Sequence, residues 1–192
     1  AVVGACEKFM PHIHVSLQSG SPSVLSRMNR PYDAYQASQY IERALRAIPR
    51  LKLSADIIAG FPGETNSELE ETVSFLKQYP FVHVHTFPYS QRKNTKAADM
   101  DGQLSGTEKR ERCLYIIQES EKIRRRILEK KIGERAMVLT EKCRDGVSSG
   151  MSEDYIETHF NASSKPGTVT DVTVIDVTDT AAGGSALTAK VP

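Results

Sequence analysis

The chain has 192 residues, 39% of them hydrophobic, which is enough to bury one or two cores. No apolar run approaches the ~18 residues that a membrane-spanning helix requires, so the sequence excludes such a helix. The net charge of +1 hides an asymmetry: residues 1–131 carry 20 Lys and Arg against 15 Asp and Glu, whereas residues 132–192 carry 5 against 9.

The first two-thirds of the chain alternates expected strands and helices. We expect the end of a helix at 1–10, strands at 12–17, 51–59 and 81–87, and helices at 33–48 and 65–78. On the third strand, Phe and His residues should share one side and Val, Val and Thr the other. Strands joined by crossover helices form a parallel sheet with right-handed connections. Three strands are too few to close a barrel, so we expect an open sheet edge and a chain that is part of a longer protein.

The remaining sequence predicts a long helix and a different kind of domain. Residues 91–106 lack periodicity and should form a loop, and 107–131 should form one helix. After residue 132, short β-rich segments at 136–140, 155–159, 169–177 and 187–191 are separated by Gly, Ser, Asn and Asp. We therefore divide the chain into an α/β part at 1–106, a connecting helix at 107–131 and a small all-β barrel at 132–192.

Candidate ligand-binding groups follow the ends of the expected strands. Residues 18–21 follow the first strand, Asp56 and Gly60 lie near the end of the second, and residues 87–90 end the third. The carboxyl ends of parallel strands meet at one edge, where ligands bind. These segments offer amides, hydroxyls and an apolar ledge, and Arg27 or Arg30 could bind a carboxylate. Such groups would suit an adenosine-bearing ligand with an amino-acid tail.

Two His-x-His pairs suggest a different chemistry. His12 and His14, and His83 and His85, each share one face of a strand, so the four could converge on a metal ion in a hydrolase. Histidines in strands are more often hydrogen-bonded core or rim residues, and the strand ends offer few carboxylates. We therefore expect no metal site.

Four blocks in order closely resemble the radical SAM tRNA methylthiotransferases: residues 12–21, Leu25 with 27–32, 56–65, and 85–90 with Thr95 and 97–98. The first and last blocks look most like the branch that acts on threonylcarbamoyladenosine. Residues 1–131 resemble the later part of the family's (β/α) radical SAM barrel, and 132–192 resemble its RNA-contacting TRAM module. One departure is that Asp56 and Gly63 replace the Gly and Glu of the broad G-x-I-x-G-x-x-E motif, so Glu64 receives no role.

The resemblance implies S-adenosylmethionine as cofactor and 4Fe–4S clusters. It places cofactor contacts at eight positions: Gln18, Ser19, Arg30, Asp56, Ile58, Phe87, Pro88 and Tyr89. Clusters in this family need closely spaced cysteines, whereas Cys6, Cys113 and Cys143 lie far apart. We therefore expect no catalytic residue and no activity in this chain by itself.

The resemblance also implies a cytoplasmic enzyme whose substrate is a tRNA anticodon stem-loop and whose electron donor is unidentified. It would need the N-terminal part of the same protein. Three adjacent arginines, Arg124, Arg125 and Arg126, are the candidate phosphate contacts. Apart from the metal hydrolase, the remaining alternative is a stand-alone RNA-binding adaptor, with the β domain as binder. An open sheet edge argues against both, since a stand-alone domain would protect it.

Overall fold

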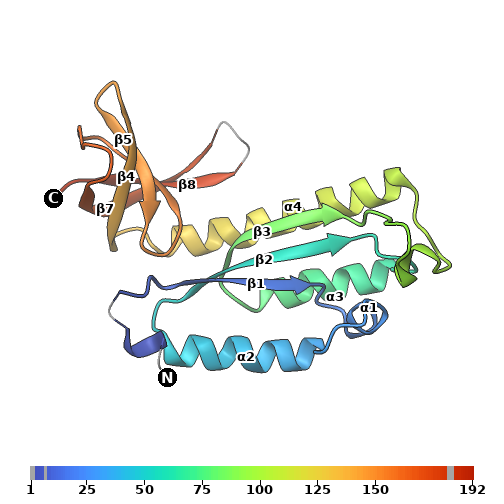
Figure 1. Ribbon diagram of the computed structural model, residues 1–192. Helices are drawn as coiled ribbons and strands as arrows, with labels where there is room; N and C mark the ends of the chain where they lie inside the picture. The colour runs from blue at the N-terminus through green and yellow to red at the C-terminus, as the bar shows by residue number, and fades with distance from the viewer. Residues whose placement is uncertain (1–2, 7, 181–183) are drawn as a thin grey trace.

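The computed structural model describes residues 3–6, 8–180 and 184–192, and has an α/β part followed by a closed β barrel (Figure 1). Three parallel strands form the sheet in the order β1 (His12–Gln18), β2 (Lys52–Ala59) and β3 (Phe81–Pro88). The expected parallel α/β architecture is therefore confirmed. Only a 3-10 turn, Val3–Ala5, stands in the described part of residues 1–10, where we expected the end of a helix.

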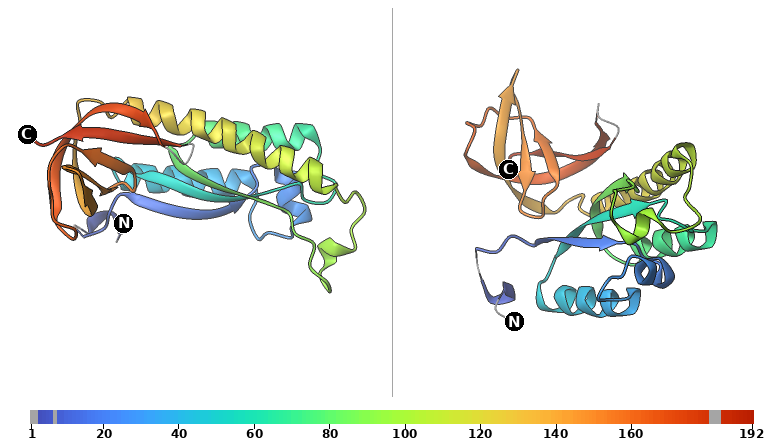
Figure 2. Two further views of the ribbon diagram at one scale, coloured as in Figure 1. Left: turned by 90° about the horizontal axis from the view of Figure 1, so that it is seen from above. Right: turned by 45° about the vertical axis from the view of Figure 1, so that its right-hand side comes forward.

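All the longer helices lie on one face of the sheet (Figure 2): α2 (Ala34–Ala47), α3 (Asn66–Lys77) and α4 (Gly106–Glu129). Each begins with a capping box, at Asp33, Thr65 and Ser105, in which side chains satisfy free N–H groups of the first turn. A short helix, α1 (Pro22–Arg27), follows β1, and a 3-10 turn, Lys96–Ala98, interrupts the loop before α4. No described helix could cross a membrane.

The main core lies between the sheet and the helices. Ala55 and Ile57 of β2 are fully buried there, together with Leu76 of α3. A register shift between Leu53 and Ser54 gives β3 one extra residue, so Phe81 packs in this core while His83 lies on the opposite face. Our expectation that Phe81 shares a side with the histidines is therefore wrong.

The second core fills the barrel, whose strands are ordered β4-β5-β6-β8-β7. These strands are β4 (Arg135–Arg144), β5 (Val147–Ser152), β6 (Glu157–Phe160), β7 (Val169–Asp179) and β8 (Ser185–Lys190). Val82, the extra residue of β3, and Leu128 of α4 are fully buried in this second core, so the two parts share packing. The barrel lies beyond the amino ends of the sheet strands, away from their carboxyl ends (Figure 1).

Candidate functional site

A cavity of about 620 Å³ lies at the carboxyl ends of β2 and β3. Its lining comes from the strand ends and from the loop after β3: Gln18, Asp56, Ile58, Phe87, Pro88, Tyr89, Ser90, Arg92, Thr95 and Ala97. Six of the eight predicted cofactor contacts belong to this lining. The crossover topology brings them together from three strands, as expected for a parallel sheet.

Gln18 lines the cavity and has an unusual backbone conformation. Its φ is 68°, in the left-handed region that costs a non-glycine residue roughly 1–2 kcal/mol. The register of β1 against β2 also shifts between Val15 and Gln18. Strain of this kind persists where the surrounding structure imposes it, often at ligand sites.

Two predicted contacts, Ser19 and Arg30, lie outside this lining. Ser19 is buried, where its hydroxyl lies 3.0 Å from Oγ1 of Thr72 and accepts a hydrogen bond from the N–H of Ser21. The loop approaches α3 so closely that a Cβ on Gly20 would come within 2.6 Å of the Cβ of Phe75. Ser19 therefore holds the loop that presents Gln18, while Arg30 is exposed on the loop after α1.

Glu64 has an anchoring role that the motif comparison did not predict. Its buried carboxylate accepts a hydrogen bond of 3.0 Å from the N–H of Gly60 and pairs with Arg112 of α4 at 3.0 Å. Burial raises the pKa of Glu64. Gly60 has a φ of 73°, and a Cβ there would lie 2.6 Å from Cγ of Lys109. Together these contacts fix the turn after β2 against α4.

The end of β3 forms one wall of the cavity. The N–H of Tyr89 donates to the carbonyl of Ala59 at 2.8 Å, and the ring of Tyr89 packs edge-on against Phe61 with centroids 5.2 Å apart. The hydroxyl oxygen of Tyr89 is buried without a hydrogen-bond partner among the described residues. Buried polar groups are normally satisfied, so this hydroxyl is an exception in the described structure.

The donor set of the cavity fits S-adenosylmethionine. Ile58 and Phe87 offer apolar surface for a purine, and Gln18 offers an amide for a ribose. Asp56 and Arg92 are the acidic and the basic lining residues, which suits a zwitterionic amino-acid tail. The guanidinium of Arg92 has no partner among the described residues. The sequence did not predict a role for Arg92, because this residue lies just after residues 85–90, which resemble the family.

The four histidines lie together on the sheet face opposite the helices. His14 and His85 are parallel at a centroid distance of 5.6 Å, and His83 and His85 at 6.4 Å. Nε2 of His14 lies 3.0 Å from Oδ1 of Asp56. Rings stacked in parallel do not aim their nitrogens at a common point, and no described group of three or more His, Cys, Asp or Glu side chains could hold a metal ion.

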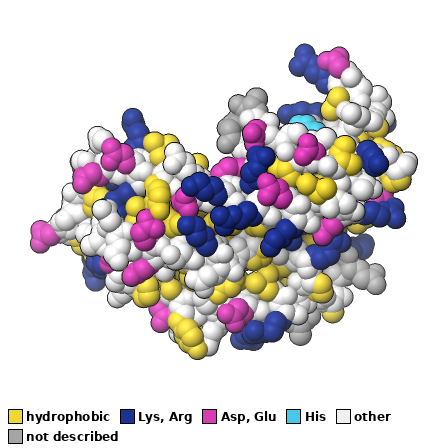
Figure 3. Space-filling model, turned by 180° about the vertical axis from the view of Figure 1, so that it is seen from behind, with side chains coloured by type: hydrophobic (Ala, Val, Ile, Leu, Met, Phe, Trp, Pro, Cys, Tyr) yellow, Lys and Arg dark blue, Asp and Glu magenta, His cyan; other side chains and the backbone are white. Residues whose placement is uncertain are grey.

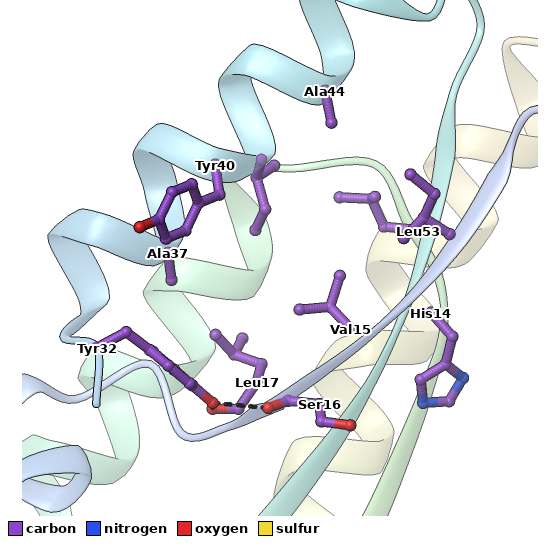
Figure 4. Close-up of a pocket in the computed structure, with 11 residues that line it drawn as sticks. His14, Val15, Ser16, Leu17, Tyr32, Ala37, Tyr40, Ala44 and Leu53 are labelled. Carbon is purple, nitrogen blue, oxygen red and sulfur yellow. Dashed lines mark hydrogen bonds between the residues drawn. The ribbon is translucent and has the colours of Figure 1, made fainter. Parts of the chain in front are cut away.

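A second cavity, of about 430 Å³, lies between α2 and β1 and is mostly apolar (Figure 4). β1 is an edge strand in the described structure, as the sequence predicted. The hydroxyl of Tyr32 donates to the carbonyl of Ser16 at 2.7 Å, which caps one group of that free edge. The lining of this second cavity has few polar groups, so we assign no ligand to the cavity.

The three predicted RNA-contacting arginines have different environments. Arg124 is buried and donates to the carbonyls of Val82 and Ser185 at 2.7 and 2.9 Å, so protein groups engage its guanidinium. Arg125 pairs with Glu129 and Asp179 on the surface. Arg126 is exposed and has no ion-pair partner among the described residues. Figure 3 shows Lys and Arg side chains gathered in the middle of the helical face.

Comparison with known proteins matches residues 5–76 to the radical SAM superfamily. The chain is 34% identical over 167 residues to the threonylcarbamoyladenosine tRNA methylthiotransferase MtaB of Chlamydia pneumoniae, covering 87% of this chain and 39% of that protein. The chain is a homologue of the radical SAM tRNA methylthiotransferases. This confirms the family resemblance.

Two further homologues differ in the nucleotide that their names specify. The MtaB protein of Bacillus subtilis is 38% identical over 122 residues, covering 64% of this chain and 27% of that protein. A tRNA-2-methylthio-N(6)-dimethylallyladenosine synthase of Endomicrobium trichonymphae is 33% identical over 169 residues, covering 82% of this chain and 40% of that protein. The chain thus spans less than half the length of each of these three radical SAM homologues.

Proposed function

We propose that this chain forms the later part of a radical SAM tRNA methylthiotransferase, which adds a methylthio group to threonylcarbamoyladenosine next to the anticodon. The observation that carries this proposal is the cavity at the carboxyl ends of the strands. Seven of its lining residues lie in the continuous stretches of three of the four blocks of sequence that resemble the family: Gln18, Asp56, Ile58 and residues 87–90. Such a protein acts in the cytoplasm, where tRNA is modified.

Within this cavity, Gln18 would hold the ribose and Ile58 would pack against the adenine. Arg92 and Asp56 would bind the carboxylate and ammonium groups of the methionyl tail, while Pro88 and Tyr89 would shape the edge facing the adenine. Ser19 would act indirectly by holding the loop of Gln18, and Arg92 replaces Arg30 as our candidate for the carboxylate. S-adenosylmethionine would supply the radical chemistry of the reaction, which side chains cannot provide.

The cysteines of this chain do not fit a 4Fe–4S cluster. Such clusters need several thiolates at one point, whereas Cys6 and Cys143 are exposed on different parts of the fold and Cys113 is buried in α4. Burial raises the pKa of the Cys113 thiol, which opposes the thiolate form that binds iron. We therefore propose that catalysis needs the family's cluster-binding segments and an electron donor in addition to this chain.

The β barrel would act as the TRAM-like module that contacts the anticodon stem-loop. Exposed Arg126, with its surface neighbour Arg125, would bind phosphate, because cations bind RNA mainly by releasing counterions. Replacing Arg126 with Ala should weaken stem-loop binding and reduce the salt slope by roughly one unit for one lost contact. Arg110→Ala, at the other end of the exposed face of α4, is the matched control. Equal losses in the two variants would contradict this assignment.

A titration with S-adenosylmethionine, followed by NMR, tests the cofactor part of the proposal. Shifts should cluster at the backbone amides of Gln18, Ile58 and Tyr89, and Asp56→Asn should weaken binding. Asp99→Asn, an exposed acidic residue in the loop before α4, is the control. Saturating shifts confined to the barrel, or no shifts at millimolar cofactor, would contradict the assignment of the cavity.

A further inference from the structure

The open face of the sheet carries polar side chains in rows that lead to the cavity. The row nearest the barrel contains His12, Ser54 and His83, and the next row contains His14, Asp56 and His85. The register of β2 against β3 pairs Ser54 with His83 and Asp56 with His85. The side chains of β1 extend each row to the third strand, because His12 contacts Ser54 and His14 contacts Asp56. Asp56 also lines the cavity, and the row of Asp56 therefore forms the junction between the open face and the ligand site.

Three of the four imidazoles are already engaged. Nε2 of His12 lies 2.7 Å from Oγ of Ser54, and His14 pairs with Asp56. His83 lies between Arg124 and the carbonyl of Tyr155, at 2.7 and 2.8 Å. His85 is exposed and has no hydrogen-bond or ion-pair partner among the described residues. Stacking against His14 and His83 nevertheless fixes the plane of its ring.

We propose that His85, with Asp56 opposite it, is the site that recognises the threonylcarbamoyl substituent of the substrate adenosine. This inference rests on the proposed function, and names the residues that select one modified nucleotide over another. The substituent carries a carboxylate and a hydroxyl, together with the N–H groups of its urea linkage. His85 can donate to the carboxylate. Asp56 lies between the two ligands and can accept from the hydroxyl or an N–H group of the substituent as well as from the cofactor's ammonium group, because a carboxylate has several acceptor lone pairs.

The same face would reject a dimethylallyl substituent. That group has no hydrogen-bonding atoms, so placing it over the row would remove water from His85 and Asp56 without replacing the lost hydrogen bonds. Sites built to bind a polar group discriminate strongly against the analogue that lacks it. Oδ1 of Asp56 faces Nε2 of His14 at 3.0 Å, so the carboxylate of the substituent would lie on the His85 side of the row.

The test compares two nucleosides and two anticodon stem-loops, each carrying either threonylcarbamoyladenosine or dimethylallyladenosine. Binding to this chain is followed by fluorescence anisotropy for the stem-loops. For the nucleosides it is followed by NMR shifts of the backbone amides of β3, including that of residue 85, which the His85 variants retain. We expect binding to the threonylcarbamoyl form to be roughly tenfold tighter, because one or two polar contacts contribute about that difference in affinity. His85→Ala should abolish the preference. The control variant His159→Ala, which removes an imidazole on the barrel, should retain it.

The two readouts separate this inference from the proposed function. If neither stem-loop binds but the threonylcarbamoyl nucleoside shifts His85, the tRNA assignment fails and the recognition site stands. Equal affinity for the two nucleosides, a preference for dimethylallyladenosine, or a preference unchanged in His85→Ala would overturn the recognition site. His85→Gln, which keeps a side-chain donor, should retain part of the preference if the site acts through hydrogen bonding.

Discussion

The guanidinium of Arg124 donates a hydrogen bond of 2.7 Å to Nδ1 of His83. Nε2 of the same imidazole lies 2.8 Å from the carbonyl of Tyr155 in the barrel, so His83 must be neutral with its proton on Nε2. Arg124 reaches the barrel as well, through the carbonyl of Ser185. These two side chains, from α4 and β3, therefore join the sheet to the barrel.

Replacing Arg124 with Met should destabilise the protein by about 2–4 kcal/mol, because the buried carbonyls of Val82 and Ser185 would lose their donor. Urea unfolding gives the change in free energy. Arg126→Met, on the exposed side of the same helix turn, should change stability by less than about 0.5 kcal/mol. Equal stability of the two variants would show that Arg124 does not join the two parts.

The stability of the protein should depend on His83 in mildly acidic solution. Burial, followed by the nearby charge of Arg124, lowers the pKa of His83 from 6.5 to about 4. The unfolded chain thus takes up this proton near pH 6.5 and the folded chain only near pH 4. The free energy of unfolding should therefore fall as the pH is lowered from 6.5 to 4, and this contribution should be complete above pH 6.5.

His83→Gln provides the comparison, since it removes the titrating group and keeps a donor for the carbonyl of Tyr155. Its unfolding free energy should fall less between pH 6.5 and 4 than that of the parent. Part of the fall should remain, because burial and His14 also lower the pKa of His12, which stacks on Tyr155. Identical pH profiles would contradict the role of His83.

Lys131 and Asp154 form a buried ion pair just beyond the end of α4. Asp154 also accepts a hydrogen bond from the hydroxyl of Ser152 at 2.7 Å. Lys131→Met should cost about 3–5 kcal/mol, because it leaves a buried carboxylate without its cation. The adjacent exposed Lys130 gives a matched control, and Lys130→Met should leave the urea midpoint almost unchanged. A small loss for Lys131→Met would mean that water or Lys52 replaces the missing charge.

Anaerobic reconstitution with iron and sulfide should yield no stable 4Fe–4S absorbance from this chain. The physical reason is the separation of its cysteines, since a cluster needs thiolates at one point. Visible absorption and iron analysis of the desalted protein provide the measurement. A near-stoichiometric cluster that disappears in a Cys6→Ser or Cys143→Ser variant would contradict our view of the donor set.

Much of the α/β part could be predicted because its signals are local. The capping residues Asp33 and Thr65 mark two helix starts, and the turn at Gly60 marks the end of a strand. The parallel topology then brings Gln18, Asp56 and Tyr89 to one cavity without any knowledge of side-chain contacts. Sequence patterns of this kind report elements and their order well.

The missed features depend on contacts between distant segments. The extra residue in β3, which moves Phe81 into the core, is set by pairing with β2. Arg124 resembles its two neighbours in sequence, and only the approach of the barrel buries it. β5 could have been found, because Asp145 and Gly146, with φ values of 51° and 80°, form a sequence typical of a two-residue hairpin turn.

A functional chimera tests the central claim most directly. This chain would replace the corresponding segment of the Bacillus subtilis homologue in cells that lack that enzyme, and tRNA nucleosides would be analysed by mass spectrometry. We predict that the chimera restores the methylthio derivative of threonylcarbamoyladenosine, and that the same chimera with Asp56→Asn restores much less. A folded chimera that leaves this nucleoside unmodified, or that modifies dimethylallyladenosine instead, would contradict the account.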